Sequence, residues 1–365
     1  MTGVIPASLA HRRIELEGQP WAVPAVAPAT AKELAGLLAG ASERGITIDV
    51  WGGGTRHGYG SPQIPDLVVS TSALAGVIEY EPDDLTLLVG AGTSLSAIED
   101  VLAERRQTAG LAESPPSSTV GGAAASAASS LRRLRLGALR ERVLQVTLVT
   151  GDGRVVTAGG RVVKNVSGYD LARLVVGSFG ALGVIVSIRL KLWPVPPAAA
   201  TVAVDEIGRA ASIYRPLALL ETADDRLVYV WGTDSEVDAA TKDLRGVSHP
   251  GLIWPAEPEG RWRWSLRVSP KHTVEAVRRL PEKWRFLALH GVGDVRAASD
   301  DAGEAPALRS WAESTGGRLV VVDSPSDSYL DPWGLPPPGI DLQRRMIAQF
   351  DPKRVLNRGR LPGGL

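Results

Sequence analysis

Cysteine is missing from this sequence of 365 residues. Its absence excludes disulfide bonds, a thiol nucleophile, and any zinc ion or iron–sulfur cluster held by cysteine thiolates. The N-terminal segment also lacks a basic region followed by an apolar core, which is the pattern of a secretory signal. Together these absences favour a cytosolic protein.

A charge excess of one sign is missing as well, because 40 lysine and arginine residues balance 40 aspartate and glutamate residues. The sequence therefore gives no electrostatic reason to expect nucleic acid or a membrane surface as a partner. Its longest uncharged run, Ser114–Leu131, is rich in serine, glycine and alanine and is too polar to span a membrane. We expect any membrane contact to be indirect, at the inner face and through partners.

Periodic runs in the first half predict an α+β fold. Thr30–Gly45 indicates a helix, and Ile46–Trp51 alternates like a strand. Ser94–Arg106 indicates a second helix, for which Ser96 and Glu99 are the expected capping pair.

Three units are expected along the chain. The run Pro194–Pro197 interrupts the pattern and is the best candidate for a domain boundary. Strand-like and helical runs alternate again beyond it and predict a second α+β domain. We therefore expect one domain at 1–197, a second at 198–335, and a C-terminal helix and tail at 336–365.

The run VWGGGTRHGYG, Val50–Gly60, follows the predicted strand. A glycine loop in this place lets backbone N–H groups approach a phosphate. The dinucleotide pattern GxGxxG fails at His57, and the P-loop pattern fails because Tyr59 and Gly60 replace its lysine and hydroxyl residue. From these residues alone, a tight surface turn is as good an interpretation as a phosphate site.

Two further segments of small residues favour the phosphate site over the surface turn. Ser117–Ser130 has a small residue at nearly every position, which is typical either of a flexible linker or of a buried wall against a large ligand. Its high alanine content favours the wall, and its hydroxyls can bind phosphate or ribityl oxygens. Lys164–Ile185 repeats the theme, with Gly177, Gly180 and Gly183 spaced by three.

Taken together, these segments resemble the PCMH-type FAD-binding domain of the vanillyl-alcohol oxidase family. The matching pieces, in family order, are VWGGGTRHGYG, PDDLTLLVGAGTSL, STVGGAAASAAS, GGRVVKNVSGYDLARLVVGSFGALGVIVSIRLKLWP and FDPKRVLNRGRL. The fourth piece is the most specific, and it is most similar to the smaller FAD-binding subunit of bacterial glycolate oxidases. The resemblance implies two α/β subdomains that bind an extended FAD, followed by a smaller, cap-like α+β domain.

The resemblance also implies which residues bind FAD. The pyrophosphate loop falls on Gly52, Gly53, Gly54, Thr55 and Arg56. The second phosphate and ribityl region falls on Pro116, Ser117, Thr119, Gly121, Gly122 and Ser126. The ring contacts fall on Gly183, Val184 and Ile185. The tail Asn357-Arg358-Gly359-Arg360 matches a family turn that returns to the flavin domain, with Arg358 in place of the usual proline.

A histidine cluster around Gly-Asp-Gly-Asn-x-His, which family members use on 2-hydroxy acids, is absent. The nearest run, LHGVGDVR, holds His290 and no second histidine nearby. We therefore expect no metal site, and no catalytic base can be identified. His57 is expected to be a polar loop residue, with covalent attachment to FAD as the less favoured alternative.

The run LRRLRLGALRER, Leu131–Arg142, holds five arginines. We favour a solvated helical face with extended side chains. A surface that docks a partner or steers an anion is the alternative.

Three functions remain open at this point. The favoured one is an FAD-binding subunit of a glycolate-oxidase-type complex, which acts on the CH–OH group of glycolate or D-lactate. Because the sequence has no cysteine, onward electron transfer would use partners, namely a second flavin subunit and an iron–sulfur subunit. The alternatives are a stand-alone FAD-dependent alcohol or hydroxy-acid oxidase of the same fold, and a flavin-fold scaffold without FAD.

Overall fold

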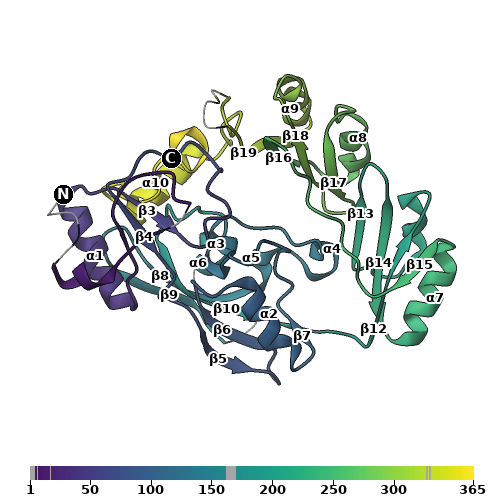
Figure 1. Cartoon of the computed structure of the whole chain (residues 1–365), viewed down its shortest axis with the longest axis horizontal. Helices are drawn as coiled ribbons and strands as arrows, with labels where there is room; N and C mark the ends of the chain where they lie inside the picture. The colour runs from purple at the N-terminus through teal and green to yellow at the C-terminus, as the bar shows by residue number, and fades with distance from the viewer. Residues whose placement is uncertain (1–4, 6, 17, 162–169, 326–327, 329) are drawn as a thin grey trace.

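The computed structural model describes residues 5, 7–16, 18–161, 170–325, 328 and 330–365. Figure 1 shows the N-terminal half together with the C-terminal helix on one side and a large antiparallel sheet on the other. The prediction for Lys164–Ile185 falls outside the described residues as far as Tyr169.

The first sheet has four strands in the order β1-β2-β4-β3. Their bounds are β1 Arg13–Ile14, β2 Ala25–Val26, β3 Ile48–Trp51 and β4 Leu67–Ser70. Strands β2, β4 and β3 run parallel, and helix α1 (Ala31–Arg44) connects β2 to β3. The helix begins where predicted, because the Thr30 hydroxyl accepts the N–H of Glu33, and it ends at Gly45 in the left-handed conformation.

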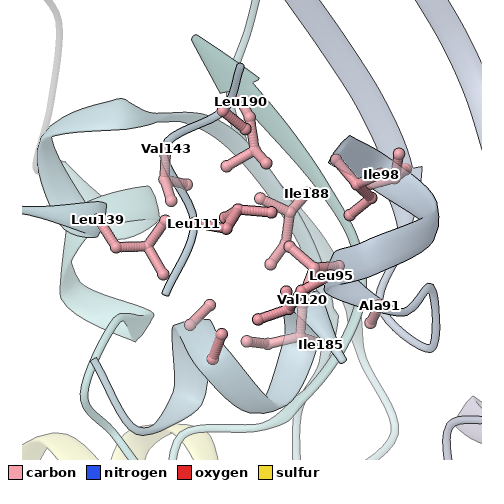
Figure 2. Packing of buried hydrophobic residues seen from close by; sticks show 14 of the residues in the cluster. Ala91, Leu95, Ile98, Leu111, Val120, Leu139, Val143, Ile185, Ile188 and Leu190 are labelled. Carbon is pink, nitrogen blue, oxygen red and sulfur yellow. The ribbon is translucent and has the colours of Figure 1, made fainter. Parts of the chain in front are cut away.

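The second sheet is antiparallel, with strands in the order β5-β6-β10-β8-β9. Their bounds are β5 Val77–Glu81, β6 Thr86–Gly90, β8 Val143–Val149, β9 Val155–Gly159 and β10 Val184–Lys191. Helices α2 (Leu95–Ala103), α3 (Val120–Ala125) and α6 (Leu171–Val175) contribute to the core beside this sheet. Figure 2 shows that core, in which Leu95 and Ile98 of α2 meet Val120 of α3 and Ile188 of β10. A short pair of strands, β7 (Gln107–Thr108) and β11 (Trp193–Pro194), lies beside it.

The predicted capping pair of α2 is wrong. The helix is capped by Ser94, whose hydroxyl accepts the N–H of Ala97. Glu99 instead accepts hydrogen bonds from the Thr108 hydroxyl at 2.7 Å and from the N–H of Ala109 at 3.2 Å. A serine followed three residues later by a glutamate caps a helix only when the helix begins at that serine. Here the helix begins at Ser94, two residues before Ser96.

The remaining sheet has eight antiparallel strands in the order β15-β12-β14-β13-β17-β18-β16-β19. Their bounds are β12 Ala198–Ala203, β13 Ala218–Glu221, β14 Arg226–Gly232, β15 Val247–Pro250, β16 Trp262–Arg267, β17 Arg285–Leu289, β18 Asp294–Ser299 and β19 Arg318–Asp323. Helices α7 (Asp234–Leu244), α8 (Thr273–Arg278) and α9 (Ala305–Ser314) pack on its outer face. Its inner face is turned toward the N-terminal half, where Leu131 joins a cluster with Leu217, Tyr229 and Leu287.

The last helix, α10 (Ile340–Phe350), returns to the N-terminal half. Ile347 packs against Ala181 and Leu182, and Val355 and Leu356 enter the core that contains Ile48. The expected divisions at 197/198 and 335/336 come just before β12 and a few residues before α10. The division of the chain into these three units stays a prediction.

The arginine-rich run forms two short helices, α4 (Arg133–Leu136) and α5 (Leu139–Arg142), and a fully solvated face is wrong for it. Arg142 is 2% exposed and donates to the carbonyl oxygens of Ala109 and Gly110, and burial lowers its pKa to about 10. Arg132 forms an ion pair with Glu113 at 3.2 Å. Arginine side chains therefore tie this run to neighbouring loops.

Candidate functional site

A cavity opens beside the end of strand β3. Three segments that are far apart in sequence form its wall: the glycine loop, the start of α3, and the turn before β10. The predicted residues that line it are Gly52, Gly53, Gly54, Thr55, Arg56, Thr119, Gly121, Gly122, Ser126, Gly183, Val184 and Ile185. Pro116 and Ser117 are exposed and lie outside this wall. The roles of all these residues as FAD contacts stay a prediction.

The glycine loop needs its glycines for a reason that sequence reasoning did not supply. A Cβ atom on Gly53 would lie 1.6 Å from the carbonyl oxygen of Ser117, and one on Gly52 would lie 2.5 Å from the Thr119 hydroxyl. Gly54 has φ +71°. The glycines therefore let two loops touch and build the wall, rather than only making room for a ligand.

The same loop presents unused hydrogen-bond donors. Within the described part of the chain, the backbone N–H groups of residues 53–56 donate no hydrogen bond, although these residues line the cavity. Unpaired N–H groups in consecutive loop residues form a concave site for an anion. The donor set therefore fits a phosphate group.

Polar side chains frame this anion site. The hydroxyls of Thr55 and Ser118 lie 3.0 Å apart, and Arg56 Nη2 donates to Ser114 Oγ at 3.0 Å. Burial lowers the pKa of Arg56. Arg56 lines this cavity and also a second one, described below. Its positive charge therefore contributes to the electrostatic potential in both.

The C-terminal tail holds the end of β3, as the family resemblance implied. The Asn357 side chain accepts the N–H of Val50 at 2.7 Å and donates to the carbonyl of Phe179 at 2.6 Å. Its own N–H donates to Ile48 at 2.8 Å. One asparagine therefore joins the strand before the glycine loop to the turn before β10.

Arg360 ties the tail to the loop itself. Its guanidinium is paired with Asp49 at 3.1 Å, and the two residues are 4% and 3% exposed. Burial raises the pKa of Asp49, and the charge of Arg360 opposes that shift. Arg360 also donates to the carbonyl oxygens of His57 at 2.5 Å and Tyr59 at 3.2 Å. These contacts fix the path of the loop.

His57 lines the cavity, and its ring is held by three protein groups. Its ring stacks on Trp51 with centroids 3.7 Å apart, and Arg360 Nη2 lies 2.6 Å from Nδ1. Its Nε2 lies 3.7 Å from Asp49 Oδ2. Burial, reinforced by the charge of Arg360, lowers the pKa of His57 to about 3. This environment supports a neutral structural side chain in the loop.

A second cavity adjoins the first and shares Thr55, Arg56 and Ser126 with it. Its far wall is the inner face of the eight-stranded sheet. Alternate residues of β16 and β18 point there: Arg263, Ser265, Arg267, Asp294 and Arg296. Sequence reasoning missed this face, although the alternation in RWRWSLR was a readable signal.

The charges on this wall are only partly paired. Arg296 contacts Glu257 and donates to the carbonyl of Ser129 at 2.6 Å, while Arg263 is paired with Asp323 at 2.6 Å.

Two other cations that line this cavity lack a carboxylate partner. Arg267 donates only to the Ser265 hydroxyl, and Arg56 only to Ser114, among the residues that the structure describes. Two arginines without carboxylate partners make the cavity suited to an anion.

A third cavity is lined in part by Gln343, Met346 and Ile347 of α10. Tyr59 and Phe179 contact each other with ring centroids 5.3 Å apart, and Phe179 lies 5.6 Å from Trp333. This cavity shares Ser126 with both others. Together the three cavities surround the small-residue segment predicted to be a ligand wall.

His290 does not line these cavities. It is 5% exposed, and its Nε2 lies 2.7 Å from Glu221, whose pKa this hydrogen bond lowers. Across the described ranges, no group of three or more histidine, aspartate and glutamate side chains could hold a metal ion. A helix long and apolar enough to cross a membrane is likewise not found among the described residues.

Comparison with known proteins finds relatives of part of this chain. Residues 24–159 match a family model described as FAD binding domain. D-lactate dehydrogenase of Archaeoglobus fulgidus is 34% identical over 170 residues, which cover 46% of this chain and 38% of that protein. Glycolate oxidase subunit GlcE of Escherichia coli is 34% identical over 192 residues, which cover 49% of this chain and 54% of that protein.

The fold is shared more widely than the sequence. A solved structure of alkyldihydroxyacetonephosphate synthase has a TM-score of 0.65 over 92% of this chain and 75% of that one, at 14% identity. This likeness, with the family model over residues 24–159, confirms the predicted α+β fold class that includes an FAD-binding domain. The chain spans about 38% and 54% of the length of the two curated relatives described above.

Proposed function

Since residues 24–159 form an FAD-binding domain related to glycolate oxidase subunits and D-lactate dehydrogenases, we propose that this chain is an FAD-dependent oxidoreductase. It acts on the CH–OH group of a small 2-hydroxy acid such as glycolate or D-lactate. The observation that carries the proposal is the arginine-bearing sheet face opposite the glycine loop. It supplies a site for a carboxylate next to a site for a flavin.

The residues present fit FAD. The N–H groups of residues 53–56 are unpaired donors for a pyrophosphate, and the hydroxyls of Thr55, Thr119 and Ser126 lie along the same wall. When bound there, FAD supplies a two-electron acceptor for the hydrogen at C2 of the substrate.

The second cavity orients the substrate. Arg267 and Arg56 offer two guanidinium groups to the substrate carboxylate from opposite walls, and planar guanidinium groups bind carboxylates in a defined orientation.

We further propose that the chain works as one subunit of an assembly with a second flavin subunit and an iron–sulfur subunit. This rests on its likeness to glycolate oxidase subunits and on the lack of cysteine. A cytosolic location, with membrane contact through those partners, belongs to the same proposal.

The test is to purify the chain alone, quantify its FAD, and mix it anaerobically with glycolate or D-lactate. Bleaching of the flavin absorbance by either acid supports the proposed activity. Reduction without any partner would favour a stand-alone enzyme over an obligatory subunit. A flavin that neither acid reduces, even with a glycolate-oxidase-type partner present, would refute the proposal, and a colourless protein would favour the scaffold alternative.

A further inference from the structure

We propose that Asp294 accepts the hydroxyl proton of the 2-hydroxy acid, an assignment that rests on the proposed function. Sequence reasoning found no base, because it looked for a histidine cluster. Asp294 is the first residue of β18 and lines the cavity between the sheet and the glycine loop.

One carboxylate oxygen of Asp294 is buried without a hydrogen bond. The residue is 3% exposed, its Oδ1 makes no hydrogen bond in the structure, and the Arg296 guanidinium on the same strand supplies a nearby positive charge. Buried carboxylate oxygens without a donor are rare unless a ligand or a reaction uses them. The missing donor fits a substrate hydroxyl.

The position of Asp294 on the sheet places it beside the anion site. In the antiparallel pair of β16 and β18, Asp294 lies directly opposite Arg267, and Arg296 lies opposite Ser265. Side chains directly opposite on one face of such a pair lie close together. A carboxylate bound by Arg267 therefore brings the neighbouring hydroxyl of a 2-hydroxy acid toward Asp294.

The charged and titratable groups that face Asp294 come from several elements. Arg296 shares its strand, Arg263 and Arg267 belong to β16, and Arg56 and Tyr59 belong to the glycine loop. Glu113 and Glu257 belong to loops at the same cavity. All of these line the cavity with Asp294: Arg56, Tyr59, Glu113, Glu257, Arg263, Arg267 and Arg296.

The two other carboxylates at this cavity are already engaged. Glu113 is paired with Arg132 and accepts the N–H of Leu131 at 2.7 Å. Glu257 contacts Arg296. Among the described residues that line the cavity, Asp294 is thus the carboxylate with a buried oxygen that makes no hydrogen bond.

The step balances with the flavin as oxidant. The O–H bond of the substrate breaks and its proton passes to a carboxylate oxygen of Asp294. If FAD is bound as proposed, it would supply the oxidant: the C2–H bond would break with its electron pair, which would pass with the hydrogen to the flavin as a carbonyl forms at C2. The products would be a 2-oxo acid, the two-electron-reduced cofactor and a protonated Asp294, which would return its proton to water after product release.

The test compares Asp294→Asn with the wild-type holoprotein and with a control, Asp224→Asn, at an exposed turn outside the cavity. The first readout needs no turnover. Oxalate is titrated calorimetrically in two buffers of different ionisation enthalpy, because a bound dianion beside a carboxylate favours its protonation. We expect an uptake of about one proton per oxalate in the wild type and in Asp224→Asn, and almost none in Asp294→Asn.

The second readout is rapid anaerobic flavin reduction by the better of glycolate and D-lactate. Asp294→Asn should keep its FAD and bind oxalate but reduce flavin at least about 100-fold more slowly. Unchanged proton uptake, or a reduction rate within a few-fold of the wild type, would overturn the assignment. If Asp294 governs proton uptake but no hydroxy acid reduces the wild-type flavin, the assignment of Asp294 as a proton acceptor stands and the proposed substrate falls.

Discussion

Replacing Arg360 by methionine removes the guanidinium that joins the C-terminal tail to the glycine loop. Its partner Asp49 is 3% exposed and would be left as a buried charge without a counter-ion. Breaking a buried pair in this way costs about 3–5 kcal/mol. For a domain of this size that corresponds to a fall in Tm of roughly 6–20 °C.

Flavin retention should fall as well. Arg360 donates to the carbonyl oxygens of His57 and Tyr59, so the loop with the free N–H groups loses its anchor. We expect Arg360→Met to purify with most of its FAD missing, measured by absorbance after gel filtration. Arg344→Met is the matched control, because Arg344 forms an exposed pair with Asp341 on α10 and its loss should change little.

A double variant separates the two effects. Asp49→Leu together with Arg360→Met removes both buried charges, and apolar replacement of a buried pair is often neutral or stabilising. Tm should therefore recover in the double variant, whereas FAD content should not, because the carbonyls of the loop still lack their donor. Full flavin occupancy in Arg360→Met, with Tm within roughly 2 °C of the wild type, would refute this reasoning.

Three further variants test the loop and the first helix. Gly53→Ala should lose FAD, since its Cβ would lie 1.6 Å from the Ser117 carbonyl oxygen. Flavin absorbance of the purified variant measures the FAD content, and full occupancy would contradict this prediction. Gly36→Ala should stabilise the protein by about 1 kcal/mol in urea denaturation, because this position in α1 is exposed and no atom lies within 4 Å of the new Cβ; a loss of stability would contradict it. The pKa of His57 falls from 6.5 to about 3 on folding, so its contribution to stability is complete above pH 6.5 and is lost toward pH 3, by up to about 1.4 kcal/mol per pH unit. His57→Gln should flatten that part of the pH dependence of unfolding, whereas the exposed control His249→Gln should not.

Much of the wall of the first cavity could be predicted because its signals are local. A strand that runs into consecutive glycines, and a run of small residues at Ser117–Ser130, each indicate close backbone approach without knowledge of the fold. The resemblance joined these segments, and the structure places most of the predicted residues around one cavity. Pro116 and Ser117 lie outside it because the chain turns outward there before α3 begins.

The residues of the proposed substrate site could not be predicted from local sequence patterns. Asp294 and Arg267 are neighbours only because β18 pairs with β16, and strand order in an antiparallel sheet is not encoded in any one segment. The partnership of Arg360 with Asp49 spans 311 residues, so no periodic pattern could reveal it. The burial of Arg142 could not be predicted for a related reason, since it depends on contacts with the distant loop at Ala109 and Gly110.

The distance between the glycine loop and the tail that holds it also sets the order of events during synthesis. Val50 leaves the ribosome long before Asn357, from which it is separated by 307 positions, and at about 5–20 residues per second this interval is roughly 15–60 s. During that time the nascent loop lacks the contacts that Asn357 and Arg360 supply. If the loop binds FAD as proposed, we expect flavin to be captured only after translation has passed residue 360, so that ribosome stalling before that point yields a flavin-free product.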